Sequence, residues 1–124
     1  LIMNFNSDSG SNYSSHRLFG NGTSAVVGAQ TSLTYLQYFG FSQSTSTTNP
    51  TNFVIDILDY ASTSKYKTIR VLSGLDDTQA AESEIRYGSG LWLNTAAVTS
   101  ITFLAQAGSA NFSQYSSFAL YGVK

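Results

Sequence analysis

The chain has 124 residues, a net charge of −1, 42% hydrophobic residues and only 10% charged residues. This length fits one domain with its own core, and 20 serines and 13 threonines give it a hydroxyl-rich surface in place of the usual charges. The charge argues against a nucleic-acid binder, the absence of cysteine excludes disulfides and thiolate metal sites, and no apolar run reaches the roughly 18 residues of a membrane-spanning helix.

Residues 1–5 alternate in the manner of a β-strand, with Leu1, Met3 and Phe5 on one face. Because the chain begins with Leu rather than Met, we expect it to be the C-terminal part of a longer chain. Residues 6–31 are rich in Gly, Asn and Ser, and their length far exceeds the usual connection of about 4–6 residues. They predict a long surface loop, of a kind that often carries function.

This predicted loop holds the only histidine of the chain, His16, beside Arg17 and near Tyr13. The three side chains are candidates for a cluster that contacts a ligand. Alternatively, His16 is a surface or interface residue with local hydrogen bonds. A catalytic histidine needs a nucleophile and an orienting acid, which the sequence does not place beside it.

The middle of the chain predicts three further strands. Residues 32–41 alternate, and residues 52–60 are apolar on both faces, which is typical of a central strand or of one covered by a second subunit. Residues 66–72 are expected to form a hairpin with residues 53–60, with Ile69 and Val71 toward the core. Residues 42–51 predict a polar loop.

Residues 73–81 predict another loop, with a group of acids in and just after it. Loop carboxylates bind Ca²⁺, but the EF-hand spacing is missing, which favours a solvated loop or ion pairs between neighbouring chains. The pairs Asp76/Asp77 and Glu82/Glu84 are also the candidates for the two carboxylates that a glycosidase needs.

The last third predicts a hairpin in which residues 83–87 and 91–93 flank the turn Gly88-Ser89-Gly90. A strand at 99–103, a loop at 107–116 and a terminal strand at 117–123 follow. The terminal strand is apolar on both faces, so we expect it inside a sheet. Trp92 and Tyr115 are further candidates for ligand contact; alternatively, Trp92 packs in the core and Tyr115 is a plain loop residue.

Seven to eight short strands with polar, Gly-rich connections and no convincing helix predict an all-β fold. We expect a single domain over residues 1–124, an antiparallel β-sandwich of jelly-roll-like form.

The last third also carries a recognisable pattern. It consists of Trp92, the stretch AVTSI at 97–101, Ala110-Asn111-Phe112 and the ending SFALYGVK at 117–124. In this pattern the chain resembles the C-terminal β-sandwich module of tailed-bacteriophage virion surface proteins, and residues 13–24 are similar to a stretch found in the same setting. The resemblance implies a place on the virion, as tail fibre, tail spike or capsid decoration, and a homotrimer. It supplies no catalytic residue.

These observations lead to the expectation of a non-enzymatic virion surface module that assembles with itself and with other virion proteins and binds a receptor on the host, a glycan. Contacts to sugar would use aromatic faces with amide and hydroxyl partners, and the candidates are Tyr13, His16, Arg17, Trp92 and Tyr115. No catalytic residue, metal, cofactor, nucleic acid or membrane insertion is expected. The alternatives are a capsid decoration or cementing protein without a ligand, and a fragment of a polysaccharide depolymerase.

Overall fold

The computed structural model describes residues 1–37, 50–76, 83–105 and 111–123, and within these ranges the chain forms seven β-strands and no helix. The strands are β1 (Ile2–Phe5), β2 (Tyr13–Gly20), β3 (Ala25–Leu33), β4 (Asn52–Leu58), β5 (Lys67–Leu75), β6 (Glu84–Trp92) and β7 (Ile101–Leu104). None of the described segments is a helix long and apolar enough to cross a membrane. The all-β prediction is confirmed.

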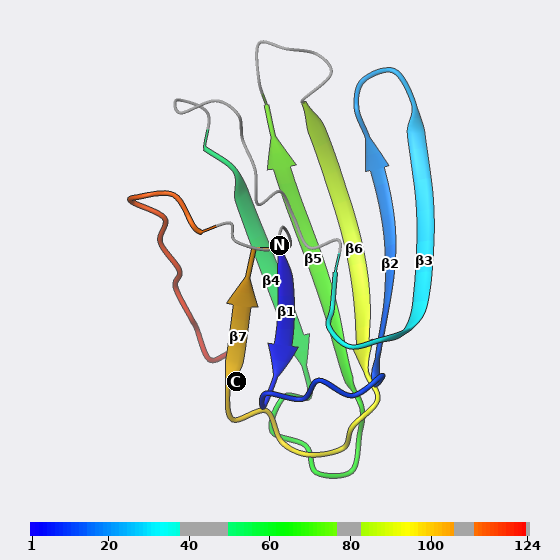
Figure 1. Cartoon of the computed structure of the whole chain (residues 1–124), viewed down its shortest axis with the longest axis vertical. Coiled ribbons are helices and arrows are strands. Elements are labelled where there is room, and N and C mark those ends of the chain that lie inside the picture. The colour runs from blue at the N-terminus through cyan, green and yellow to red at the C-terminus, as the bar shows by residue number, and fades with distance from the viewer. Residues whose placement is uncertain (38–49, 77–82, 106–110, 124) are drawn as a thin grey trace.

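Two antiparallel sheets make up the fold (Figure 1). The larger has five strands in the order β3-β2-β6-β5-β4, and the smaller pairs β1 with β7. Figure 1 shows β1 and β7 in front of one face of the larger sheet. We call this covered face the inner face and the opposite one the outer face. The arrangement is that of a sandwich with one broad and one narrow layer.

The core lies between the two layers, because alternate residues of each strand point inward. On β5 the inward positions include Ile69 and Val71, and both are buried as predicted. The core cluster also contains Met3 and Phe5 of β1 and Trp92 of β6. The predicted hairpin of residues 53–60 with 66–72 is confirmed, since β4 pairs antiparallel with β5.

The predicted long loop at 6–31 is wrong. Most of it forms a second hairpin, in which β2 and β3 pair through a turn at residues 21–24. The side-chain oxygen of Asn21 accepts hydrogen bonds from the backbone N–H groups of Thr23 and Ser24, and Gly22 takes a positive φ of 81°. The Gly-Asn-Gly sequence therefore serves a tight turn between two strands whose Ser- and Gly-rich composition concealed them.

The predicted turn at Gly88-Ser89-Gly90 is also wrong, because β6 runs unbroken from Glu84 to Trp92. Gly88 and Gly90 are buried on the inner face of this central strand, opposite Val71 and Ile69 of β5. Glycines in a strand commonly mark such a close approach of another part of the chain.

Three other predictions need correction. Of the two alternatives for residues 52–60, the central strand is wrong, because β4 is the last strand of the larger sheet, and cover by a second subunit stays a prediction. β5 continues to Leu75 through the start of the loop predicted at 73–81. Residues 117–123 form no strand. The predicted strand at 32–41 is described only as far as residue 37. Within this part β3 ends at Leu33, and Leu36 forms a single bridge with Met3. Most of the predicted loop at 42–51 lies outside the described residues.

Candidate functional site

Two of the predicted ligand-binding residues, Tyr13 and Trp92, lie in the core. Both are fully buried, and their rings stack with centroids 6.4 Å apart. The indole Nε1 of Trp92 donates a hydrogen bond to Asp8 Oδ2 at 2.8 Å. The hydroxyl of Tyr13 donates to the carbonyl of Asp8 at 3.1 Å and accepts from the backbone N–H of Phe5 at 3.2 Å. These contacts tie the strand ends together and leave neither ring open to a ligand at the surface.

Asp8 lies at the centre of these contacts with Tyr13 and Trp92, which we call the anchor. Burial raises the pKa of its carboxyl group, but hydrogen bonds from Trp92, Gly10, Asn12 and Asn94 outweigh burial and hold the pKa below its usual value. The aspartate is therefore ionised at neutral pH and acts as an acceptor for the tryptophan. Sequence inspection missed it because a lone Asp in a Ser- and Gly-rich stretch looks like an ordinary loop residue.

The predicted pair His16 and Arg17 is split by the sheet. Neighbouring residues of a strand point to opposite faces, so His16 lies exposed on the outer face while Arg17 points inward. The guanidinium carbon of Arg17 lies 4.9 Å from the centre of the Phe19 ring, and that of Arg86 lies 5.5 Å from the same ring. The fifth candidate, Tyr115, is 91% exposed in the segment after β7. The five predicted residues do not converge on one site.

The inner face carries a nearly buried ion pair beside this arginine–phenylalanine contact. Arg86 donates from Nε to Glu84 Oε1 at 2.7 Å, and both side chains are 12% exposed. The sequence places Glu84 in the strand predicted at 83–87 and also among the acids of a solvated loop. It lies on β6 with its charge matched, whereas Asp77 and Glu82 of the predicted carboxylate pairs lie outside the described residues.

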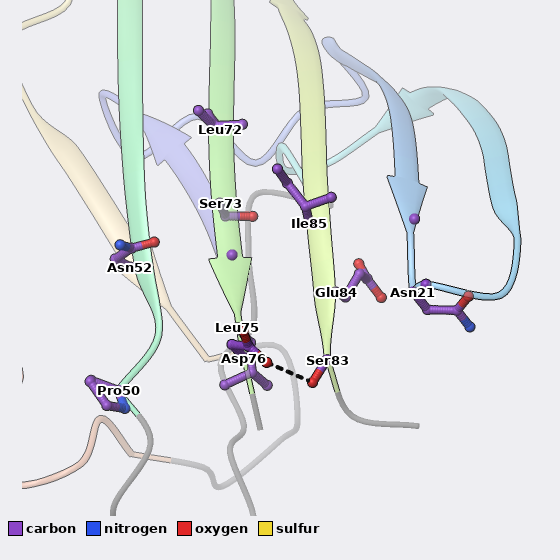
Figure 2. A pocket seen from close by; sticks show the side chains of 13 residues that line it. Asn21, Pro50, Asn52, Leu72, Ser73, Leu75, Asp76, Ser83, Glu84 and Ile85 are labelled. Atoms are coloured by element: carbon purple, nitrogen blue, oxygen red, sulfur yellow. Dashed lines mark hydrogen bonds between the residues drawn. The ribbon is translucent and has the colours of Figure 1, made fainter. Parts of the chain in front are cut away.

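A polar hollow of about 830 Å³ lies at the strand ends, and we call it the tip hollow (Figure 2). Its polar lining combines amide, carboxylate and hydroxyl groups: Asn21, Asn52, Ser73, Asp76, Ser83 and Glu84. Asp76 Oδ1 accepts a hydrogen bond from Ser83 Oγ at 3.2 Å. Ser73 is only 3% exposed, and its Oγ has no hydrogen-bond partner among the residues that the structure describes.

These groups suit the hydroxyls of a sugar, which donate to carboxylates and amide oxygens and accept from amide N–H groups. The described lining contains no aromatic ring to stack on a sugar face. Among the residues that the structure covers, no group of three or more His, Asp or Glu is placed to hold a metal ion. The sequence did not single out Asn21, Asn52 or Ser73, because their proximity depends on the strand register.

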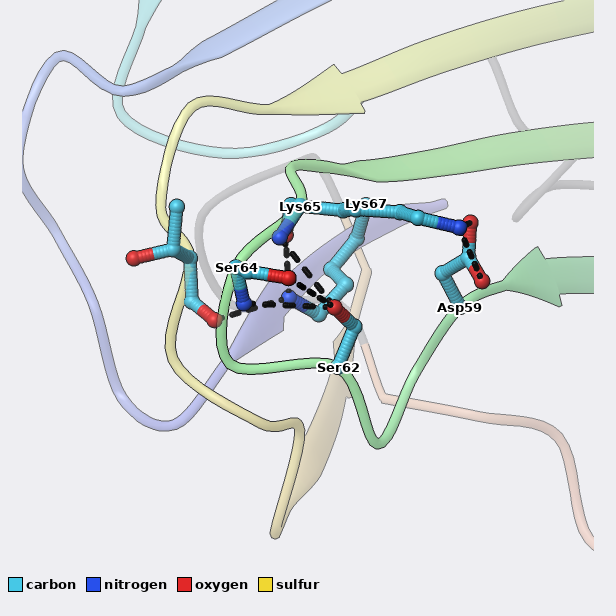
Figure 3. A network of polar contacts seen from close by, with 6 residues as sticks. Asp59, Ser62, Ser64, Lys65 and Lys67 are labelled. Atoms are coloured by element: carbon cyan, nitrogen blue, oxygen red, sulfur yellow. Dashed lines mark hydrogen bonds and ion pairs between the residues drawn. The ribbon is translucent and has the colours of Figure 1, made fainter.

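The opposite end of the sheet holds a buried cation, Lys67 (Figure 3). Its ammonium group donates to the carbonyl oxygens of Lys65 and Thr95, at 2.7 and 3.1 Å, and lies 5.9 Å from the Trp92 ring centre. The neighbouring Lys65 forms an exposed ion pair with Asp59. Since two carbonyls and an aromatic face satisfy the Lys67 charge, its role is to hold the loops at this end together.

The outer face is unusually apolar. Five side chains between 49% and 77% exposed form a row across all five strands, which we call the outer apolar row. From one edge of the sheet to the other they are Val54, Leu72, Tyr87, Leu18 and Val27.

A second apolar surface is the terminal segment, residues 117–123. Leu120, Tyr121 and Val123 are more than 80% exposed. Phe118 holds the segment to the sandwich, because its ring stacks on Phe103 with centroids 5.2 Å apart. Tyr121 and Val123 border a second hollow together with residues of β4, at the edge of the larger sheet.

No family model, curated protein or solved structure matches this chain. Functional inference therefore rests on the surfaces described above and on the sequence pattern of the last third.

Proposed function

We propose that this chain is a non-enzymatic surface module of a tailed-bacteriophage virion, which assembles as a homotrimer and presents its strand ends to a glycan of the host cell. The sequence pattern that ends in LYGVK supports the phage setting. The proposal includes a jelly-roll-like sandwich. Residues 117–123 would bring the fold closer to that form by pairing as a further strand with a neighbouring copy.

The observation that carries the proposal is the exposure of the terminal segment. Burial of a Leu, Val or Tyr side chain is worth about 1.5–3 kcal/mol, so three such side chains in water forgo a large gain. The same chain offers β4, the last strand of the larger sheet, as a place for a strand-like partner. When the segment of each copy packs on the edge of the next, the contact is head-to-tail, and a threefold ring closes it.

The tip hollow supports the glycan part of the proposal. Its amide, carboxylate and hydroxyl groups are the partners that sugar hydroxyls require, and it lies at the ends of the strands, where loops can adjust specificity. His16 and Tyr115 are exposed and stay candidates for further contacts with the glycan. Arg17, which points to the inner face, stays a candidate as well.

The assembly part is tested by removing residues 117–124 and comparing the truncated and intact chains by light scattering coupled to gel filtration. We expect the intact chain to have three times the monomer mass, or six times where two trimers associate, and the truncated chain to lose this trimer. Leu120→Lys serves as a finer variant, with Thr102→Lys on the exposed side of β7 as the matched control. An intact chain that stays monomeric at high concentration would refute the assembly.

The glycan part is tested on an array of bacterial surface polysaccharides. We expect binding that falls at least tenfold in Asn52→Ala and is unchanged in Ser64→Ala, an exposed residue at the opposite end of the sheet. A trimer that binds no glycan or host cell but stabilises phage heads would favour the cementing protein instead. Cleavage of a polysaccharide that disappears in Asp77→Asn or Glu82→Gln would favour the depolymerase.

A further inference from the structure

The outer apolar row has a symmetry that the strand register makes visible. Val54 pairs with Leu72, Leu72 with Tyr87, Tyr87 with Leu18, and Leu18 with Val27. The row therefore reads Val, Leu, Tyr, Leu, Val, and it reads the same from either edge of the sheet. Tyr87 stands at its centre, on the middle strand β6.

This symmetry matters when two such faces meet. Faces that pack against each other in a symmetric dimer are related by a twofold axis that lies between them. If the axis runs along the strands, Val54 of one copy meets Val27 of the other, and Leu72 meets Leu18. If the axis runs along the row, each side chain meets its own counterpart. In both cases valine faces valine, leucine faces leucine, and Tyr87 faces Tyr87.

The charges of the outer face do not oppose such a contact. Among its described positions the charged side chains are Asp56 and Arg70, which form an ion pair with each other at 2.8 Å. The face therefore has no net charge to repel its copy. Asp56 and Arg70 lie in the row on one side of the outer apolar row. The row on its opposite side, on the same face, contains small or apolar residues and one amide: Asn52, Gly74, Ile85, Gly20 and Ala25.

The projected area of the outer face is in the range of a weak contact between copies rather than a standard specific interface. Five strands about 4.8 Å apart, with seven to nine residues that each rise about 3.3 Å, span roughly 20 by 25 Å, or about 500 Å² in projection. The side chains roughen this plane and add accessible surface. A specific interface takes about 800 Å² from each partner, and weak ones take less than about 600 Å².

We propose that two copies of this chain pack outer face against outer face about a twofold axis, with Tyr87 at the centre of the contact. β1 and β7 cover part of the inner face, and the second copy supplies a layer on the other side, at the spacing of about 10 Å usual for stacked sheets. This contact goes beyond the proposed function and uses none of the terminal segment.

The test uses sedimentation velocity of the intact chain over a range of concentrations. We expect Tyr87→Lys to weaken the twofold association at least tenfold, because it places two like charges against each other at the centre. Thr102→Lys adds the same charge on β7, away from this face, and should change nothing. Circular dichroism establishes that each variant is folded; if Tyr87→Lys does not fold, Val27→Lys on the outermost strand β3 takes its place.

Cross-linking supplies a second measurement. The chain has no cysteine, so Tyr87→Cys introduces a single thiol that meets its own symmetry mate across the axis. A short bismaleimide should join two copies of Tyr87→Cys in high yield and should not join Thr102→Cys. Equal sedimentation of wild type and Tyr87→Lys, or equal cross-linking of the two cysteine variants, would overturn the proposal. Equal sedimentation of wild type and Tyr87→Lys, together with a trimer that is lost on removal of residues 117–124, would overturn this contact and leave the proposed function standing.

Discussion

At the scale of single residues, the half-buried Asp8 holds together two fully buried aromatic side chains, Tyr13 and Trp92. One carboxylate accepts the indole N–H of Trp92 and also holds Asn12, while the Tyr13 hydroxyl closes the other side of the same loop. Aromatic residues that suggested sugar contacts in the sequence therefore serve stability. A ligand site must be sought among exposed groups.

The Asp8 carboxylate makes the stability of the fold depend on acid. Because its pKa is lower in the folded chain than in the unfolded chain, its contribution is fully present above the unfolded value near 4 and is lost as the pH falls through the folded value. Asp8→Asn should cost about 1–3 kcal/mol at pH 7 and much less at pH 2.5. Urea unfolding at both pH values measures this, and an equal cost at both would contradict it.

A substitution of Tyr13 tests whether this residue stabilises the fold or binds a ligand. Tyr13→Phe leaves the buried N–H of Phe5 without the hydroxyl that it donates to, so we expect a loss of about 1–3 kcal/mol in unfolding free energy. Glycan binding by the folded variant should be unchanged. Tyr115→Phe, at a residue almost fully exposed, is the control and should leave the stability within about 0.5 kcal/mol. Thermal unfolding compares the two; equal stability of both variants would speak against the anchor.

At the scale of elements, alternation in apolar segments was predictable and glycine-rich strands were not. Residues 52–58 and 67–72 are rich in Ile, Val and Leu, and both strands follow from the sequence, as does the inward face of the second. The strands β2 and β6 contain serines and glycines, and the same residues signal turns when their partners are unknown. Only the register of the sheet shows that Gly88 and Gly90 lie beside Val71 and Ile69 of β5.

The site was less predictable than the fold for a related reason. The tip hollow brings together Asn21, Asn52 and Asp76 from three separate hairpins or strand ends, so that no local spacing announces it. The outer apolar row likewise takes one residue from each strand. Single exposed apolar residues are common, and the row acquires meaning only when the pairing of all five strands is known.

The unbroken β6 strand gives a prediction at this scale. Gly90→Val adds a branched side chain to a buried inward position between Ser15 and Ile69, and overpacking of this kind costs about 1–3 kcal/mol. Ser89→Thr, on the exposed side of the same strand, should be neutral or slightly stabilising. Chemical denaturation of the two variants distinguishes them. A tolerated valine at position 90 would indicate that the glycines form a turn after all.

At the scale of the whole molecule, the sandwich leaves two apolar surfaces in water, the terminal segment and the outer apolar row. They lie on different parts of the fold and suit different symmetries, a ring for the first and a twofold pair for the second. A small domain that kept both exposed would be prone to nonspecific association. Defined assembly is the arrangement that covers them.

Sedimentation equilibrium of the intact chain tests this account most directly. Over micromolar to millimolar concentrations we predict trimers and twofold pairs of them. The terminal segment is required for the trimer, and Tyr87 is required for the twofold contact. A chain that sediments as a folded monomer throughout this range would contradict the central claim that its exposed apolar surfaces are interfaces between copies.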